Sequence, residues 1–439
     1  MRRVSQLFQP LITIPKNAKI KNTEITCKSQ KHLLECGLVR PTSSGLFILL
    51  PLAQRSLKKL ENITTTCIER TGAQRLALPK LTSAGLWEKT GRIEIGPELL
   101  KVEDRHGKKY LLAPTHEESI ADLLADVGPL SYKQLPLLLY QIGEKYRDEH
   151  RPKHGVLRSR EFVMLDAYGA HAAAACALQV YESVTVAYRR IFDILELPVH
   201  RVEAPTGDMG GSLSHEWQLK ADVGEDSIDI CPSCSHASLA GAEGERCKNC
   251  GTDMDTFNSI EVGHTFILGT KYSEALNANF VPNNGTAEPI LMSCYGIGLT
   301  RLLAASLEAL SDEKSMRWPK AIAPYSLIII GPKEGSKEWQ SHGWDKIAKL
   351  YDSITNIPNL MNDVLVDDRH NMTIGKRLMM AERMGYPTIV VCGKSILDSP
   401  PTYEIHDLTG TDVVTHSFTL DQLLQFLERN NDEYLKIRL

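Results

Sequence analysis

The arginines best placed to do chemistry lie in one short segment, YRDEHRPKHGVLRSREF, at residues 146–162. Apolar stretches typical of strands flank this segment, so it predicts a hairpin with a basic loop. Guanidinium groups match phosphate oxygens through paired hydrogen bonds, and such a loop could therefore hold a polyphosphate. A charged hairpin lying in solvent is the alternative that this segment alone leaves open.

A second candidate is CYGIGLTRLLAA at residues 294–305, where Gly296 and Gly298 precede a helix and Arg301 lies one turn inside it. The third glycine of a dinucleotide-binding fingerprint is missing, which argues against a Rossmann site. The two glycines would instead let a flat ligand approach the backbone closely, with Arg301 held beside it.

The third candidate is the acidic string APTHEES at residues 113–119. Thr115 and Glu117 alternate along it and could together bind a small ammonium group. The alternative is a helix cap with acidic residues in the first turn, which is a common arrangement.

Four of the ten cysteines form two CxxC pairs, Cys231 with Cys234 and Cys247 with Cys250. This double spacing predicts a tetrahedral zinc site. Four thiolate ligands would leave no open coordination position, so the zinc would be structural. Reduced core cysteines or a disulfide pair are the alternative.

Composition limits the remaining choices. A chain of 439 residues, 42% of them hydrophobic, is expected to fold as more than one globular domain. The net charge of −4 excludes a protein covered in cations, so any contact with nucleic acid must use local basic patches. No apolar run approaches the roughly 18 residues that cross a bilayer, and we expect no membrane partner. The scattered single cysteines indicate a reducing compartment.

Hydrophobic periodicity supplies the elements that must position these residues. It predicts helices at 52–71, 170–195 and 300–310, strands at 75–79, 137–147 and 162–168, and a hairpin at 99–113. From Pro324 onward, short apolar strands alternate with helices, which indicates a separate α/β domain with a mainly parallel sheet.

The N-terminal segment is basic, since Arg2 and Arg3 are followed by three lysines before Glu24, the first acidic residue. This bias predicts a mitochondrial presequence at residues 1–26 and hence a location in the matrix. A frayed basic terminus is the alternative.

The three candidate segments, in this order, resemble the motifs of class II aminoacyl-tRNA synthetases, with Pro79 ending the first motif. The strings RPTSSGLF, PTHEE, EKYRDEHRP, GGSLSHEW, EVGHTF and CYGIGLTR are similar to those of prolyl-tRNA synthetases of the bacterial and mitochondrial type. The resemblance covers residues 27–435. It implies an α+β catalytic domain at 27–323, with an antiparallel sheet flanked by helices, and a C-terminal α/β anticodon-binding domain at 324–439.

Roles for individual residues follow from this resemblance alone. It implies that Arg147 and Arg301 are catalytic, and that Arg147, Glu149, Arg158, Phe162, Glu216 and Arg301 bind ATP. It also implies that Thr115, Glu117, Arg147, His264 and Cys294 bind proline, and that Asp368, Arg369 and Lys376 contact the anticodon. One departure is LDAYGA where the family often has KDAYSF, which puts the role of that neighbourhood in doubt.

The activity implied is ligation: proline is activated with ATP and Mg²⁺ and transferred to the 3′ end of tRNA-Pro by a homodimer. The four-cysteine insert, at about 225–256, stands where bacterial relatives carry an editing domain, and it leaves no room for one. Three rivals remain: a threonyl enzyme, a synthetase-like accessory subunit without catalysis, and a zinc-ribbon protein that binds nucleic acid.

Overall fold

The computed structural model describes residues 1–10, 25–95, 98–241, 246–410 and 412–438. The chain divides into two compact units. One comprises Pro41–Phe47 and Glu61–Ala305, and we call it the catalytic unit. The other comprises Met1–Arg40, Ile48–Leu60 and Ser306–Leu439, and we call it the C-terminal unit.

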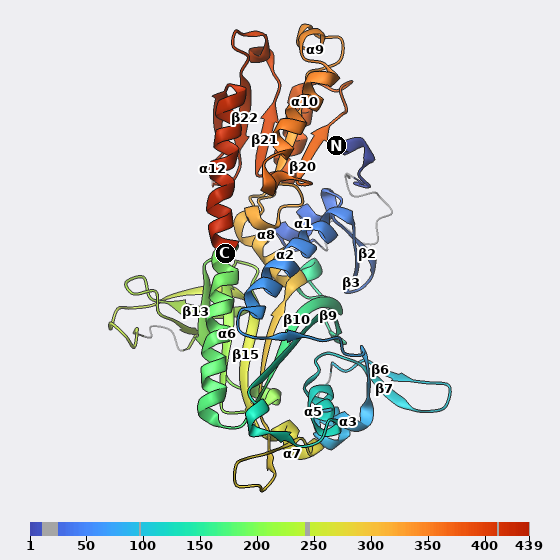
Figure 1. The fold of residues 1–439 in the computed structure, drawn as a ribbon, viewed down its shortest axis with the longest axis vertical. Coiled ribbons are helices and arrows are strands. Elements are labelled where there is room, and N and C mark those ends of the chain that lie inside the picture. Colours follow the sequence, from blue (N-terminus) through green and yellow to red (C-terminus); the bar gives the residue numbers. More distant parts are fainter. Residues whose placement is uncertain (11–24, 96–97, 242–245, 411, 439) are drawn as a thin grey trace. The chain divides into compact units, whose positions relative to one another are not determined.

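A nine-stranded sheet organises the catalytic unit. Along its main path lie β11 (Val199–Glu203), β12 (Leu213–Lys220), β15 (Asp255–Gly269), β18 (Leu291–Gly298), β10 (Glu161–His171), β9 (Leu137–Tyr146) and β4 (Gln74–Arg75). Neighbours on this path are antiparallel except β4, which runs parallel to β9. β13 (Asp226–Ile230) joins β15 and carries β14 (Ala237–Leu239) at the side of the sheet (Figure 1). The predicted antiparallel sheet is confirmed.

Helix α6 (Ala174–Ile194) runs along this sheet (Figure 1). Its buried face includes Tyr181, Tyr188 and Ile191. Tyr188 meets Trp217 of β12 with ring centroids 5.5 Å apart. Burial of such aromatic side chains contributes strongly to the stability of the folded state. The packing of α6 therefore holds one face of the sheet in place.

Shorter elements complete the catalytic unit. They are α3 (Ala84–Lys89), α4 (Arg92–Ile95), α5 (Glu117–Asp126), α7 (Lys271–Leu276), a sheet of β5 (Leu81–Ser83), β6 (Lys101–Glu103) and β7 (Lys109–Leu112), and a sheet of β8 (Leu130–Ser131), β16 (Asn279–Val281) and β17 (Glu288–Pro289). The hairpin expected at 99–113 is confirmed by β6 and β7. The strand expected at 75–79 is shorter than predicted. Its later residue Leu78 does not continue the backbone pairing with β9, because its N–H donates to the side-chain Oε1 of Gln141 at 3.2 Å.

The C-terminal unit contains a six-stranded sheet in the order β1-β20-β19-β21-β22-β23. The strands are β1 (Arg2–Arg3), β20 (Val364–Asp367), β19 (Leu327–Ile330), β21 (Thr388–Val391), β22 (Tyr403–Asp407) and β23 (Val414–Phe418). The first four are parallel and the last two pair antiparallel, as a mainly parallel sheet requires.

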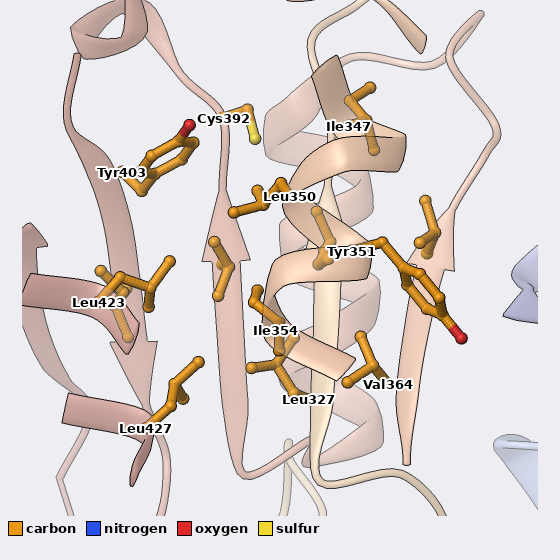
Figure 2. Packing of buried hydrophobic residues seen from close by; sticks show 14 of the residues in the cluster. Leu327, Ile347, Leu350, Tyr351, Ile354, Val364, Cys392, Tyr403, Leu423 and Leu427 are labelled. Carbon is orange, nitrogen blue, oxygen red and sulfur yellow. The ribbon is translucent and has the colours of Figure 1, made fainter. Parts of the chain in front are cut away.

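Helices α9 (Lys337–Ser341), α10 (Trp344–Thr355), α11 (Ile374–Met384) and α12 (Leu420–Arg438) accompany this sheet. Figure 2 shows Ile347, Leu350 and Ile354 of α10 in the same buried cluster as Leu327 and Val364 of the strands. All five residues are buried. The spacing of the α10 residues places them on one helix face, and this face closes the core of the sheet.

The unit boundary differs from the predicted boundary at residue 324, because helix α1 (Lys28–Glu35) and the segment after α8 (Leu299–Leu310) belong to the C-terminal unit. Ser29 N–H donates to Glu308 Oε2 at 2.7 Å, and the His32 ring lies 2.7 Å from Asp312 O. In the same unit, Asp363 pairs with cations from α2 (Pro51–Glu69), which confirms the helix expected at 52–71. Strands β2 (Val39–Ser43) and β3 (Leu46–Leu49) form a hairpin.

Part of the predicted presequence forms a strand. Arg2 and Arg3 pair in parallel with Leu365 and Val366 of β20, and Ser5 N–H donates to Asp368 Oδ1 at 2.9 Å. Residues 11–24 of the predicted presequence lie outside the described residues. Among the described residues, the helices are too short or too polar to cross a bilayer.

Candidate active site

A cavity of about 570 Å³ opens in the catalytic unit, over strands β10, β15 and β18. It is lined by most of the residues that the sequence singled out, namely Thr115, Glu117, Arg147, Glu149, Phe162, His264, Cys294 and Arg301. Arg158 and Glu216 do not line it. The structure therefore collects side chains from segments almost 190 positions apart, between 115 and 301, at one place.

One part of the cavity carries Arg147 and Arg301, together with the carboxylates of Glu98, Glu149 and Glu261. Arg147 follows directly after β9, and its guanidinium lies 5.2 Å from the ring centroid of Phe162 on β10. Burial and the nearby charge of Arg301 lower the pKa of Arg147. Within the described part of the chain, the Arg147 guanidinium makes no hydrogen bond to protein. It is thus a partly desolvated cation facing an open space, which suits an anionic ligand.

Arg301 is held in place by backbone oxygens. Its Nε donates to Leu157 O at 2.9 Å and its Nη1 to Glu261 O at 3.3 Å. These bonds fix the side chain of α8 at the cavity wall beside the glycine-containing end of β18. The position fits the expectation that Arg301 lies over a flat ligand, a role that stays a prediction.

Arg158 lies just outside the cavity, in the loop between β9 and β10. Its Nε donates to Glu149 Oε2 at 2.8 Å, and its Nη1 also pairs with Glu225. Lys153 of the same loop lies 2.6 Å from Glu225 Oε1. The loop cations are therefore balanced by carboxylates in this state, and Arg158 would have to leave Glu225 to reach an outer phosphate.

Another part of the cavity carries the carboxylate of Glu117, with Arg92 beside it. Thr115 lies just before α5, and Glu117 is its first residue. Thr115 Oγ1 donates to Glu117 Oε2 at 2.5 Å. Glu117 is buried, and Arg92 Nη1 lies 3.5 Å from Glu117 Oε2 and 3.1 Å from Glu118 Oε1. Thr115 and Arg92 both contact Glu117 through Oε2, and the Cys294 thiol also hydrogen-bonds to the Glu117 carboxylate.

His264 and Cys294 also line the cavity. His264 Nδ1 lies 2.9 Å from Glu261 Oε1, its Nε2 lies 2.7 Å from Ser214 Oγ, and its ring stacks on Phe266 at 4.0 Å. Burial and the nearby Glu117 carboxylate raise the pKa of Cys294 well above its usual value. Cys294 therefore remains a neutral thiol that shapes the pocket and is a poor nucleophile.

Glu216 lies on β12, one strand away from the cavity. Gln218 Nε2 donates to Glu216 Oε2 at 2.9 Å. Burial and the charge of Glu261 raise the pKa of Glu216. Such a carboxylate would gain from a nearby cation, but the cavity itself does not include it.

Sequence reasoning missed Arg92 and Trp87, which also line the cavity. Arg92 is buried and its guanidinium lies 4.6 Å from the Trp87 ring centroid. Neither belongs to a periodic stretch or a motif that the sequence made visible. The one available signal was a pair of adjacent acids, Glu117 and Glu118, which need a cation if both are buried.

The four cysteines of the insert come together as predicted. Their Sγ atoms all lie within 4.8 Å of one another. The separations are 3.4 Å for Cys231 and Cys250, 3.5 Å for Cys234 and Cys247, and 3.7 Å for Cys234 and Cys250. Zn–S bonds of about 2.3 Å in a tetrahedron place sulfurs roughly 3.8 Å apart. The cluster thus fits a zinc ion, and all four thiols are unbridged.

The predicted anticodon residues lie beyond β20 in the C-terminal unit. Asp368 accepts hydrogen bonds from Ser5, and Arg369 Nη2 lies 2.6 Å from Asp367 Oδ2. Lys376 is exposed in the first turn of α11. Of the three, Lys376 presents its charge to solvent, whereas Asp368 and Arg369 are engaged within the unit.

Family models match two regions of the chain. Residues 100–310 match the tRNA synthetase class II core domain (G, H, P, S and T), and residues 358–430 match an anticodon-binding domain. The chain is 42% identical over 423 residues to the probable mitochondrial proline–tRNA ligase of Rattus norvegicus, covering 94% of this chain and 88% of that one. It is 45% identical to the human counterpart, covering 88% and 82%. It is 35% identical to the proline–tRNA ligase of Sulfurimonas denitrificans, covering 90% and 93%.

Solved structures share the fold. A prolyl-tRNA synthetase from Cryptosporidium parvum, complexed with L-proline and AMP, superposes with a TM-score of 0.73 at 17% identity, covering 93% of this chain and 77% of that chain. The same enzyme with halofuginone and AMPPNP gives a TM-score of 0.75. The predicted class II architecture with an anticodon-binding domain is confirmed.

Proposed function

Because the chain belongs to the proline–tRNA ligase family, we propose that its cavity holds proline beside Glu117 and the phosphates of ATP beside Arg147. The chain is an ATP-dependent ligase that joins proline to tRNA, and it has no editing domain in the segment between β12 and β15. The observation that carries the proposal is that one cavity is lined both by Arg147 and Arg301 and by the buried Glu117 carboxylate.

The Glu117 carboxylate supports recognition of an amino acid nitrogen. The prolinium group would donate to Glu117 and meet Thr115, while Cys294 and His264 line the space for the ring. A buried carboxylate bonds a cation more strongly than one in water does, because the site excludes competing solvent. The substrate carboxylate would then point toward Arg147.

Arg147 and Arg301 support adenylate formation. The proline carboxylate would attack the α-phosphorus in line, and Arg147 and Arg301 would stabilise the negative charge that develops there. Phe162 and Arg301 would enclose the adenine, with Glu149 at its edge and Arg158 reaching the outer phosphates. Magnesium, with Glu216 as its nearest predicted protein ligand, would neutralise the triphosphate.

Four further proposals concern the rest of the molecule. The four-cysteine cluster holds a structural zinc ion, and Asp368, Arg369 and Lys376 contact the anticodon of tRNA-Pro. The enzyme works as a homodimer and resides in the mitochondrial matrix. Relatives named as mitochondrial and the basic N-terminal segment support this location.

The test is pyrophosphate exchange with each of the twenty amino acids. We expect exchange that depends on proline, and we expect Arg147→Ala to abolish it, because no other described cation faces that part of the cavity without a protein hydrogen bond. Arg105→Ala, in the exposed turn between β6 and β7, is the matched control and should retain full exchange. Near-normal exchange by Arg147→Ala would refute the assignment, provided that its melting temperature equals that of the control.

A further inference from the structure

A buried polar network lies beneath the loop that carries Thr115 and Glu117. At its centre, Asp166 of β10 lies 2.6 Å from Lys145 Nζ, with side chains that are 6% and 1% exposed. Asp166 Oδ2 also accepts from Tyr168 OH at 2.6 Å and from Gln141 Nε2 at 3.0 Å. Asp166 and Tyr168 lie in LDAYGA, the segment whose departure from the family pattern left its role in doubt.

The network reaches the loop through Tyr168. The Tyr168 hydroxyl accepts from the backbone N–H of His116 at 2.9 Å and lies 3.4 Å from Thr115 Oγ1. Its single proton is given to Asp166, and the Thr115 proton is given to Glu117. Tyr168 therefore has no donor left for a ligand, although it borders the cavity.

A second branch passes through Gln141, which does not line the cavity. Gln141 Nε2 lies 2.9 Å from His116 Nδ1, and His116 Nε2 lies 3.0 Å from Pro79 O. With Gln141 donating, the His116 ring carries its proton on Nε2 and donates to Pro79. The backbone and the ring of His116 are thus both anchored, one by Tyr168 and one by Gln141.

Electrostatics keep this arrangement in one state. Burial alone would raise the pKa of Asp166, but the Lys145 ammonium and the hydrogen bond from Tyr168 lower it, so the carboxylate stays ionised. Burial and the Asp166 charge raise the pKa of Tyr168 well above its usual value, so the phenol keeps its proton. Each hydrogen bond therefore has one direction, and the position of His116 is fixed.

We propose that Tyr168 and Gln141 are positioning residues that hold the Thr115–Glu117 loop in the geometry that binds the prolinium nitrogen. The proposal rests on the function proposed above. It assigns a specific task to the LDAYGA segment: the network sets the affinity for proline while leaving the affinity for ATP unchanged. A network that only stabilises the fold would affect both substrates alike.

Two variants and one control separate these possibilities. Tyr168→Phe removes the hydroxyl under His116, and Gln141→Met removes the support of the ring. Tyr140→Phe, whose hydroxyl donates to Glu69 Oε1 at 2.6 Å away from the cavity, is the matched control. Half-saturating concentrations of proline and ATP are measured by pyrophosphate exchange, together with melting temperatures.

We expect the half-saturating proline concentration to rise about five- to twentyfold in Tyr168→Phe and Gln141→Met, the loss typical of one or two buried hydrogen bonds. The value for ATP should stay within about twofold, and Tyr140→Phe should change neither. Gln141 does not line the cavity, so an effect of Gln141→Met must act through its partners in the network, His116 and Asp166. Unchanged proline values, or equal shifts for both substrates, would overturn the proposal. Lack of proline-dependent exchange in the unmodified enzyme would instead refute the proposed function.

Discussion

At the scale of single residues, residue types and spacing were enough to predict many residues of the candidate site, but not all of them. Thr115, Glu117, Arg147 and Arg301 were chosen from the sequence, and the cavity brings them together. Arg92 was not chosen, because its role depends on two acids that approach it only after folding. Local patterns reveal residues within one element, whereas pairing between distant elements becomes visible only in the structure.

The role of the Glu117 charge can be tested by Glu117→Gln. The amide keeps the size of the carboxylate but loses its charge, while Arg92 retains its partner Glu118. A hydrogen bond to a charged group contributes about 1.5–3 kcal/mol, so half-saturation by proline should need roughly 10- to 150-fold more substrate. Glu88→Gln, on the exposed side of α3, is the control. A proline requirement that matches this control would remove Glu117 from the site.

At the scale of elements, long periodic segments were predicted well and short ones poorly. Helices α2, α6 and α8 agree closely with expectation, because their apolar spacing extends over several turns. β1 could not be predicted, because two residues carry no pattern and their pairing with β20 depends on an edge built 360 positions later. Helix α4 could not be predicted for the same reason, because its four residues are too few to show a pattern.

The four-cysteine insert makes an element-scale prediction about metal. Purified protein should contain one zinc ion per chain, and Cys247→Ser should lose it, since three thiolates hold zinc less well than four. The variant should also melt at a lower temperature, because β13, which pairs with β15, ends directly before Cys231. Cys176→Ser, which alters a half-buried thiol of α6, should keep its zinc. Metal analysis and thermal unfolding measure both effects, and a metal-free protein with an intact melting temperature would contradict the zinc site.

At the scale of the whole molecule, division into domains was the least predictable feature. The sequence placed a boundary at residue 324 because the pattern of elements changes there. In the structure, residues 27–40 and 306–323 belong to the unit that contains the C-terminal sheet, joined to it through contacts such as Trp318 Nε1–H donating to Met384 O at 2.9 Å. Such contacts join segments that are distant in the sequence, and no local pattern marks them.

The missing editing domain leads to a prediction about fidelity. The segment between β12 and β15, residues 221–254, contains β13, β14 and the cysteine cluster. Alanine lacks two ring methylenes of proline, and each missing methylene allows discrimination by only about 1–3 kcal/mol. The enzyme should therefore form some Ala-tRNA-Pro and leave it intact, because it has no second site to hydrolyse this product. Deacylation of purified Ala-tRNA-Pro should proceed at the rate seen in buffer alone, with heat-denatured enzyme as the control. Rapid hydrolysis by the native enzyme would reveal an editing activity within the catalytic unit itself.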